Sequence, residues 1–147
     1  MFTIQMTIAR PASDVFARLA RVEEAPLWYS AVTSVDRLDT GPVVVGTRFR
    51  FTRNLGGRSV VNVVEVTAFE PDRTVELSSV SGPTPFVYRY RLAPSTDATV
   101  LRLEGTITGE GLAGPIALLK PLAETFFRRG MVANLERLKR LIEGDGL

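Results

Sequence analysis

The chain has 147 residues, 45% of them hydrophobic and 23% charged, which is the size and composition of one globular domain with a buried core. It contains no Cys and no His, which excludes disulfides, thiolate nucleophiles, Ser-His triads and imidazole or thiolate metal ligands. The formal net charge is only +2, and the arginines are spread over every segment instead of clustering, so we expect no nucleic-acid partner.

The N-terminal part predicts one strand followed by two short helices. Apolar and polar residues alternate over residues 2–8, which is the period of a half-buried strand. Pro11 to Asp14 is typical of a helix start with a Ser or Asp cap. A second short helical stretch is expected over residues 22–27, where Pro26 disturbs the pattern.

Residues 31–104 predict six more strands. We expect them at residues 31–38, 43–53, 60–69, 74–80, 86–92 and 99–104. Gly- and Pro-containing turns separate these runs, and residues 54–58 (Asn-Leu-Gly-Gly-Arg) are expected to form a hairpin loop. Connections this short favour an antiparallel meander.

The C-terminal part predicts a long helix. Pro115 is favourable in a first helical turn, and apolar residues then recur at spacings of three and four. The apolar face comprises Leu119, Ala123, Phe126, Phe127, Met131, Leu135, Leu138 and Ile142. Pro121 either kinks this helix or separates a first turn from a main helix that begins near Leu122.

These elements predict a single α+β domain over residues 1–147. An antiparallel sheet of about seven strands has one face to bury, and only the long C-terminal helix has enough apolar surface to cover it. A sheet of this length curls, which favours a hollow between sheet and helix. Large aromatic side chains would either line that hollow as an open cavity or fill it.

Several short motifs occur in an order typical of one superfamily. They are residues 10–16 (RPASDVF), 26–28 (PLW), 41–42 (GP), 45–49 (VGTRF), 66–71 (VTAFEP) and 98–100 (ATV), with Leu135, Leu138, Lys139 and Arg140. Over essentially the whole chain this order resembles the START-like (SRPBCC) superfamily, in particular its polyketide cyclase/dehydrase-type and coenzyme Q-binding branches. The resemblance implies a helix-grip fold with an internal cavity for a hydrophobic small molecule. It carries over no catalytic set, and the branch with Rieske and mononuclear iron is excluded because it needs Cys and His.

The candidate ligand-binding residues are those expected to point between sheet and helix. They are Trp28, Phe49, Phe51, Arg53, Asn62, Val64, Leu77, Tyr88, Tyr90, Leu101, Leu103, Leu119 and Phe126. For the aromatic members an ordinary core role is the competing interpretation. Tyr88 and Tyr90 stand out, because a buried hydroxyl needs a partner that a ligand or a cavity water could supply.

Two further polar residues on predicted strands have alternative orientations. Arg53 either points inward with Phe51, where an anionic ligand group would pair with it, or reaches solvent at the hairpin end. Asn62 shares the parity of Val64 and is expected to point inward, either to orient a ligand or to meet water near the strand end. Glu76 and Glu104 are expected on the outer face in weak pairs with arginines.

Three functions stay open on the sequence alone. The first is binding of a hydrophobic small molecule (a lipid, quinone or aromatic polyketide-like compound) as a carrier or sensor. The second is a cyclase or dehydratase that uses Tyr88, Tyr90 or Arg53 to polarise a carbonyl or stabilise an enolate. The third is a homodimeric interaction module with a filled core, whose outward Val61, Val63 and Val87 form a surface patch.

The remaining patterns bear on location, cofactors and access to the cavity. No apolar run approaches the roughly 20 residues that span a bilayer, and the alternating start is not typical of a signal peptide, so we expect none. We therefore expect a cytoplasmic protein, monomeric or homodimeric, with no membrane span, no metal and no cofactor. Gly109 to Gly114 is not a phosphate loop, because no Lys-Ser/Thr follows, but it could form a flexible lid over the cavity mouth.

Overall fold

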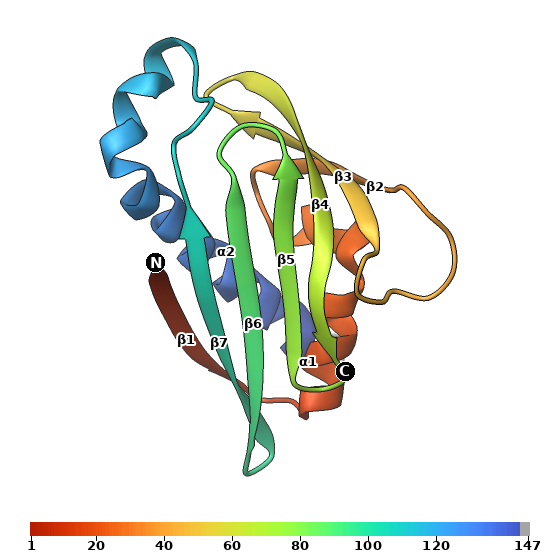
Figure 1. Ribbon diagram of the computed structural model, residues 1–147. Coiled ribbons are helices and arrows are strands. Elements are labelled where there is room, and N and C mark those ends of the chain that lie inside the picture. The colour runs from red at the N-terminus through yellow and green to blue at the C-terminus, as the bar shows by residue number, and fades with distance from the viewer. Residues whose placement is uncertain (145–147) are drawn as a thin grey trace.

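In the computed structural model, residues 1–144 are described, and their strands form one curved seven-stranded antiparallel sheet (Figure 1). The strands are β1 (Phe2–Ile8), β2 (Val32–Arg37), β3 (Arg48–Leu55), β4 (Arg58–Glu70), β5 (Thr74–Ser81), β6 (Phe86–Ser95) and β7 (Ala98–Ile107). Their order across the sheet is β1-β7-β6-β5-β4-β3-β2. The predicted meander is therefore confirmed for β2 to β7. Strand β1 pairs with β7 and forms one edge of the sheet.

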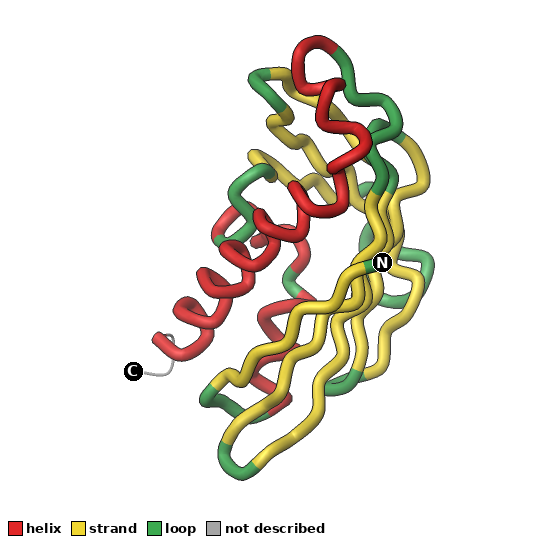
Figure 2. Tube along the Cα trace, turned by 90° about the vertical axis from the view of Figure 1, so that its left-hand side faces the viewer, coloured by secondary structure: helices red, strands yellow, loops and turns green. Residues whose placement is uncertain are grey.

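The helices cover one face of the sheet (Figure 2). Helix α1 (Ala12–Ala20) and the 3-10 helix η1 (Val22–Leu27) connect β1 to β2, as predicted. A second 3-10 helix, η2 (Gly114–Leu122), leads into the long helix α2 (Ala123–Gly144). Of the two alternatives for Pro121, the second is confirmed, because Pro121 lies in a separate segment that ends just before α2 begins.

The buried stripe of α2 shows that two orientation predictions were wrong. It comprises Ala123, Phe127, Met131, Asn134, Leu135, Leu138 and Ile142. Phe126 was expected on this stripe but is 46% exposed, because at about 100° per residue it lies roughly 120° from the centre of the stripe. Leu119 was expected there too, but it belongs to η2, which contains no buried residue.

Two turns differ from the sequence expectation. The strand expected from residue 43 begins only at Arg48, because Gly46 turns the chain at φ +97° and Val44 and Val45 stay exposed. The hairpin between β3 and β4 is tighter than expected. Its turn is Gly56-Gly57 alone, and both glycines have positive φ, as a two-residue hairpin turn with matched twist requires.

The outer face of the sheet carries the ion pairs expected there. Arg89 Nε donates to Glu76 Oε2 at 2.6 Å, and Arg91 Nε donates to Glu104 Oε1 at 2.7 Å. Burial would raise the pKa of Glu76, but hydrogen bonds from Thr67 and Arg89 outweigh it, and this pKa is lowered. Partly exposed pairs of this kind stabilise a fold only slightly.

Residues 1–144 contain neither a candidate membrane span nor a metal-binding cluster. None of their helices is both long enough and apolar enough to cross a membrane. In the same residues, no group of three or more acidic side chains gathers as the ligands of a metal ion would.

Candidate functional site

Most of the predicted ligand-binding residues are buried on the face of the sheet that the helices cover. The buried ones are Trp28, Phe49, Phe51, Arg53, Asn62, Val64, Leu77, Tyr88, Tyr90, Leu101 and Leu103. Strand alternation places them there, since the burial pattern of β3 and β6 has period two. The structure therefore brings together all of the set except Leu119 and Phe126, and their contact with a ligand stays a prediction.

Arg53 is the most deeply buried charged residue of the site, with 1% of its surface exposed. Its Nε and Nη2 donate to Asn62 Oδ1 at 3.0 and 2.7 Å, and Nη2 also donates to Pro83 O at 2.9 Å. A further hydrogen bond runs from Nη2 to Thr84 Oγ1. The inward alternative for Arg53 is thus confirmed, and the hairpin end does not give its side chain a path to solvent.

The partners of Arg53 are all electrically neutral. Within residues 1–144 no carboxylate forms an ion pair with it, so the guanidinium keeps an uncompensated charge in a buried site. That is a costly arrangement. Burial lowers the pKa of Arg53, and Tyr29 and Tyr88 oppose the shift, but a guanidinium stays protonated in proteins. The Phe86 ring adds a cation–π contact, with its centroid 5.5 Å from Cζ.

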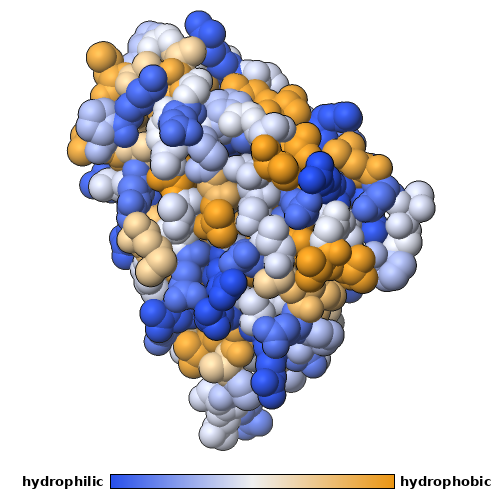
Figure 3. All heavy atoms as spheres, in the orientation of Figure 1, coloured by the Kyte–Doolittle hydropathy of each residue, from blue (hydrophilic) through white to orange (hydrophobic). Residues whose placement is uncertain are grey.

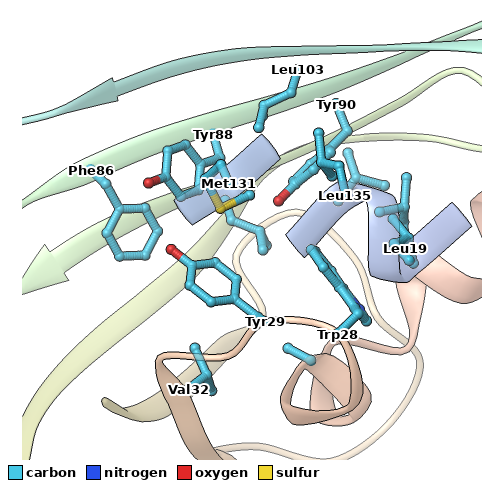
Figure 4. Packing of buried hydrophobic residues seen from close by; sticks show 14 of the residues in the cluster. Leu19, Trp28, Tyr29, Val32, Phe86, Tyr88, Tyr90, Leu103, Met131 and Leu135 are labelled. Atoms are coloured by element: carbon cyan, nitrogen blue, oxygen red, sulfur yellow. The ribbon is translucent and has the colours of Figure 1, made fainter. Parts of the chain in front are cut away.

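Tyr88 presents the opposite problem, a buried hydroxyl with no hydrogen-bond partner among the described residues. Its ring stacks on Phe86 at 4.9 Å between centroids. The Tyr29 hydroxyl lies on the same side of the cluster (Figure 4), but the two hydroxyls do not meet hydrogen-bond geometry. Burial raises the pKa of Tyr88 well above its usual value, and Tyr29 raises it further. Tyr88 is therefore a neutral hydroxyl that makes no hydrogen bond of good geometry among the described residues, with Tyr29 as its polar neighbour.

The space beside these tyrosines is small. It is lined by Leu19, Arg21, Val22, Ala25, Trp28, Tyr29, Phe51, Val75, Leu77, Phe86, Tyr88 and Tyr90. A water-sized sphere has about 20 Å³ available there, which is room for one water and far less than the roughly 300 Å³ of a small ligand pocket. Of the two sequence alternatives, the structure shows an interior that aromatic side chains fill.

A larger hollow lies at the end of the sheet, beside the β3–β4 hairpin. Its volume is about 350 Å³, within the range of small-molecule pockets. It is lined by Leu55, Arg58, Ser59, Val60, Pro83, Gly111, Leu112, Ala113 and Ile116. We call it the mouth hollow. Pro83 lies between this hollow and the interior, because it lines the hollow and its carbonyl accepts a hydrogen bond from Arg53.

The mouth hollow is closed on one side by residues 108–122, which we call the lid segment. Two glycines allow its close approach: a Cβ on Gly56 would lie 3.0 Å from Ile116, and one on Gly111 would lie 2.8 Å from Pro83. Thr84 joins the lid to Arg53, since its N–H donates to Glu110 O and its hydroxyl accepts from the guanidinium. Thr84 also has a φ of +48°, which is strained for a β-branched residue.

Tyr29 and Thr84 belong to this site, although the predicted ligand-binding residues include neither; Tyr29 was expected only to point toward the space between sheet and helix, and Thr84 was missed. Tyr29 follows η1 outside any regular strand, and Thr84 lies in the β5–β6 loop, so no periodicity indicated their orientation. The one available signal was Pro on both sides of Thr84, which restricts the loop backbone.

Comparison with known sequences gives one family match. The model of the family described as "Polyketide cyclase / dehydrase and lipid transport" matches residues 1–143. No curated protein matches the chain.

Solved structures with the same fold are numerous and distant in sequence. A protein from Thermus thermophilus has a TM-score of 0.80 at 16% identity, covering 99% of this chain and 98% of that one. The Zhui aromatase/cyclase from a Streptomyces species has a TM-score of 0.79 at 18% identity, covering 97% and 92%. A START superfamily protein from Mycobacterium smegmatis has a TM-score of 0.69 at 18% identity, covering 98% and 94%. At these identities the likeness shows the helix-grip fold alone.

Proposed function

The chain belongs to the polyketide cyclase/dehydrase and lipid transport family, and on that premise we propose that it binds a hydrophobic small molecule between the sheet and α2, as a carrier or sensor. The observation that carries the proposal is that two buried polar groups, the Arg53 guanidinium and the Tyr88 hydroxyl, both lack matching partners. One is a buried cation with neutral partners only, and the other is a buried hydroxyl with none. Both groups lie in an otherwise apolar interior, where unmatched polarity is costly.

The proposed ligand has an apolar body and an electron-rich oxygen at one end. A carboxylate, phenolate or quinone oxygen would accept hydrogen bonds from Arg53 and from the neutral Tyr88 hydroxyl. The apolar body would pack on the aromatic and aliphatic residues of the interior, with Phe51 and Leu77 on the sheet side. Fatty acids, quinones and phenolic aromatic polyketides all have this division of polarity.

Access to the interior requires movement, since the enclosed space holds only about one water. The mouth hollow supports a route, because it is of ligand size and touches the interior at Pro83. A ligand oxygen that takes over the Arg53 Nη2 donor would weaken its bonds to Pro83 and Thr84. Thr84 holds the lid segment through Glu110, so ligand binding and lid opening would be linked.

Thermal denaturation with three probes tests the proposal: oleate for carboxylates, menadione for quinones and emodin for phenolic polyketides. A probe at about 100 times its Kd adds roughly 2.7 kcal/mol of stability, which raises Tm by about 5–10 °C in a domain of this size. The Arg53→Met and Tyr88→Phe variants should lose most of the shift. Arg102→Met, on the outer face, is the matched control and should keep it.

Two results would count against the binding proposal. One is the absence of a Tm shift with all three probes in the parent chain. The other is an equal shift in Arg53→Met, Tyr88→Phe and Arg102→Met, because the binding would then not involve the buried polar pair.

A second candidate function is cyclisation or dehydration of a polyketide-like chain, and the same two donors favour it. A cyclase must polarise a ketone and stabilise the enolate that forms, and a fixed cation beside a neutral hydroxyl can do both. One neighbour in the same fold is an aromatase/cyclase by its own description.

Incubation with a synthetic poly-β-ketone thioester tests this second function. Ring formation with loss of water is detected by mass spectrometry. The expected result is turnover whose kcat falls in Tyr88→Phe while KM changes little. Saturable binding of the thioester without turnover would assign the protein to the carriers.

A further inference from the structure

The junction between η2 and α2 exposes large apolar side chains that the described part of the chain leaves uncovered. Leu118 is 85% exposed, Leu122 60% and Phe126 46%. Figure 3 shows hydrophobic side chains interleaved with hydrophilic ones at this end of the molecule, at the upper left. Single exposed apolar residues are ordinary, but several gathered on one protrusion mark an interaction surface.

The same junction carries cations without partners. Lys120, Arg128 and Arg129 are exposed, and across residues 1–144 none of them forms an ion pair. The acidic residue between them, Glu124, is paired with the amino group of Met1 at 3.1 Å. The junction therefore presents apolar tips together with a net positive charge.

The position of the junction connects it to the proposed ligand route. Ile116 of η2 lines the mouth hollow, and Leu118 and Leu122 follow it in the same short helix. Two of the three exposed apolar side chains, Leu118 and Leu122, thus lie on the lid segment that would move to admit a ligand, and Phe126 follows in the first turn of α2.

We propose that the η2–α2 junction, residues 118–129, docks on the surface of an anionic lipid bilayer. Leu118, Leu122 and Phe126 enter the acyl boundary while Lys120, Arg128 and Arg129 contact the headgroups, as in interfacial helices that combine Leu or Phe with basic residues. The inference rests on the proposed function, because an apolar ligand would then pass between bilayer and interior without crossing water. Protruding tips flanked by unpaired cations fit a lipid surface, whereas a protein partner is normally met by a closely packed complementary patch.

Vesicle co-sedimentation tests the docking surface. Vesicles of phosphatidylglycerol mixed with phosphatidylcholine should bind the protein, and vesicles of phosphatidylcholine alone should bind it far more weakly. Each of Lys120→Gln, Arg128→Gln and Arg129→Gln should weaken binding to the mixed vesicles about fivefold, the contribution of one cation near an anionic surface. The triple variant Leu118→Ser, Leu122→Ser, Phe126→Ser should weaken it at least tenfold.

Matched controls come from exposed residues on the outer face of the sheet. Val61→Ser and Val87→Ser remove exposed apolar surface elsewhere, and Arg50→Gln removes an exposed cation elsewhere. All three should leave vesicle binding unchanged. Circular dichroism of every variant, with Tm compared to the parent chain, verifies that the fold is kept.

Three outcomes would overturn the docking surface. They are no binding to the mixed vesicles, equal losses in the junction and control variants, and a concentration-dependent dimer in analytical ultracentrifugation that the triple variant abolishes, which would make a second copy the occupant. Emodin, menadione and oleate titrated in solution separate this failure from failure of the proposed function. Probe binding without vesicle binding rejects only the docking surface, and vesicle binding without probe binding supports docking and counts against the ligand site.

Discussion

Arg53 shows how far a buried charge depends on its neighbours. Asn62 Oδ1 accepts two hydrogen bonds from the Arg53 guanidinium. Asn62 Nδ2 donates to Ser81 O at 3.2 Å and to Pro83 O at 2.8 Å. The amide therefore holds both the guanidinium and the β5–β6 loop. Loss of either function would leave a buried polar group unmatched.

Replacing Asn62 by Ala should lower the free energy of unfolding by about 3 kcal/mol, because two bonds to a charged donor are removed together. Urea denaturation monitored by circular dichroism measures the change. Asn54→Ala is the control, since its side chain accepts only an exposed turn N–H from Gly57, and it should cost under about 1 kcal/mol. Equal losses at the two positions would contradict the role given to Asn62.

Replacing Tyr88 by Phe should raise the free energy of unfolding at neutral pH by about 1 kcal/mol, because an unpartnered buried hydroxyl is removed. The variant should also lose less stability at high pH. The folded-state pKa of Tyr88 is raised, so above about pH 10 the unfolded chain releases this proton first and stability falls as pH rises. Urea denaturation at pH 7 and pH 10.5 measures both effects.

A destabilised Tyr88→Phe variant with an unchanged alkaline slope would contradict this account. Destabilisation would mean that the hydroxyl has a good partner in solution, such as a water in the small cavity, and an unchanged slope would mean that burial does not raise the pKa of Tyr88. The same measurement on Tyr90→Phe, whose pKa is also raised by burial, distinguishes a property of Tyr88 from one shared by the buried tyrosines.

Much of the site at this scale could be predicted because strand alternation decides orientation. Arg53 shares the parity of Phe51, and Asn62 that of Val64, so period two indicated both inward positions. The acceptors of Arg53 could not be predicted in the same way. Pro83 and Thr84 reach it from a loop whose backbone path depends on tertiary contacts with Glu110.

At the scale of elements, the turns decide where the polar site lies. Gly82 in the β5–β6 loop has a φ of +104°, and a Cβ there would come 2.4 Å from Val61 O and 2.7 Å from Asn62 Nδ2. Only glycine combines that backbone conformation with that close approach. The loop therefore presses Pro83 and Thr84 onto the guanidinium.

Gly82→Ala should destabilise the fold clearly more than Gly41→Ala. Both substitutions place an alanine at strongly positive φ, which costs on the order of 1–3 kcal/mol, but Gly41 has open space around its Cβ position whereas Gly82 does not. Thermal denaturation of the two variants measures the difference. Equal losses would show that the loop relaxes away from Asn62.

The long helix shows why an element can be predicted while its orientation is partly wrong. The apolar positions of residues 119–142 include both Phe126 and Phe127 at spacings of three and four. At about 100° per residue only Phe127 shares the face of Met131, Leu135 and Leu138, and Phe126 lies outside the buried stripe. Spacing alone therefore predicts the helix, whereas the buried face follows only from the angle of each position.

At the scale of the whole molecule, a ligand can enter the filled interior only if part of the structure opens, and we expect that part to be the lid segment. The lid segment ends in η2, which has no buried residue, whereas β6 and β7, both inner strands of the sheet, pair over ten residue pairs. Segments with few buried contacts open most readily. Ligand access through the lid therefore needs less free energy than access through the sheet.

Hydrogen exchange should show this difference directly. Amides of residues 110–122 are expected to exchange much faster than those of β6 and β7, and emodin binding should slow them, because ligand that occupies only the folded state suppresses opening. Mass spectrometry of peptides from the exchanged protein measures both rates. Lid amides as slow as those of β6, or unaffected by a probe that binds, would contradict the access route.

Arginine side-chain NMR tests the central claim most directly, because it observes the Nε–Hε group of Arg53 itself. Titration with emodin, or with whichever of the three probes raises Tm, should shift the Arg53 resonance and the ring resonances of Tyr88. The exposed Arg102 should stay in place. A probe that binds but leaves Arg53 and Tyr88 unshifted would contradict the claim that these two residues receive the polar end of a hydrophobic ligand.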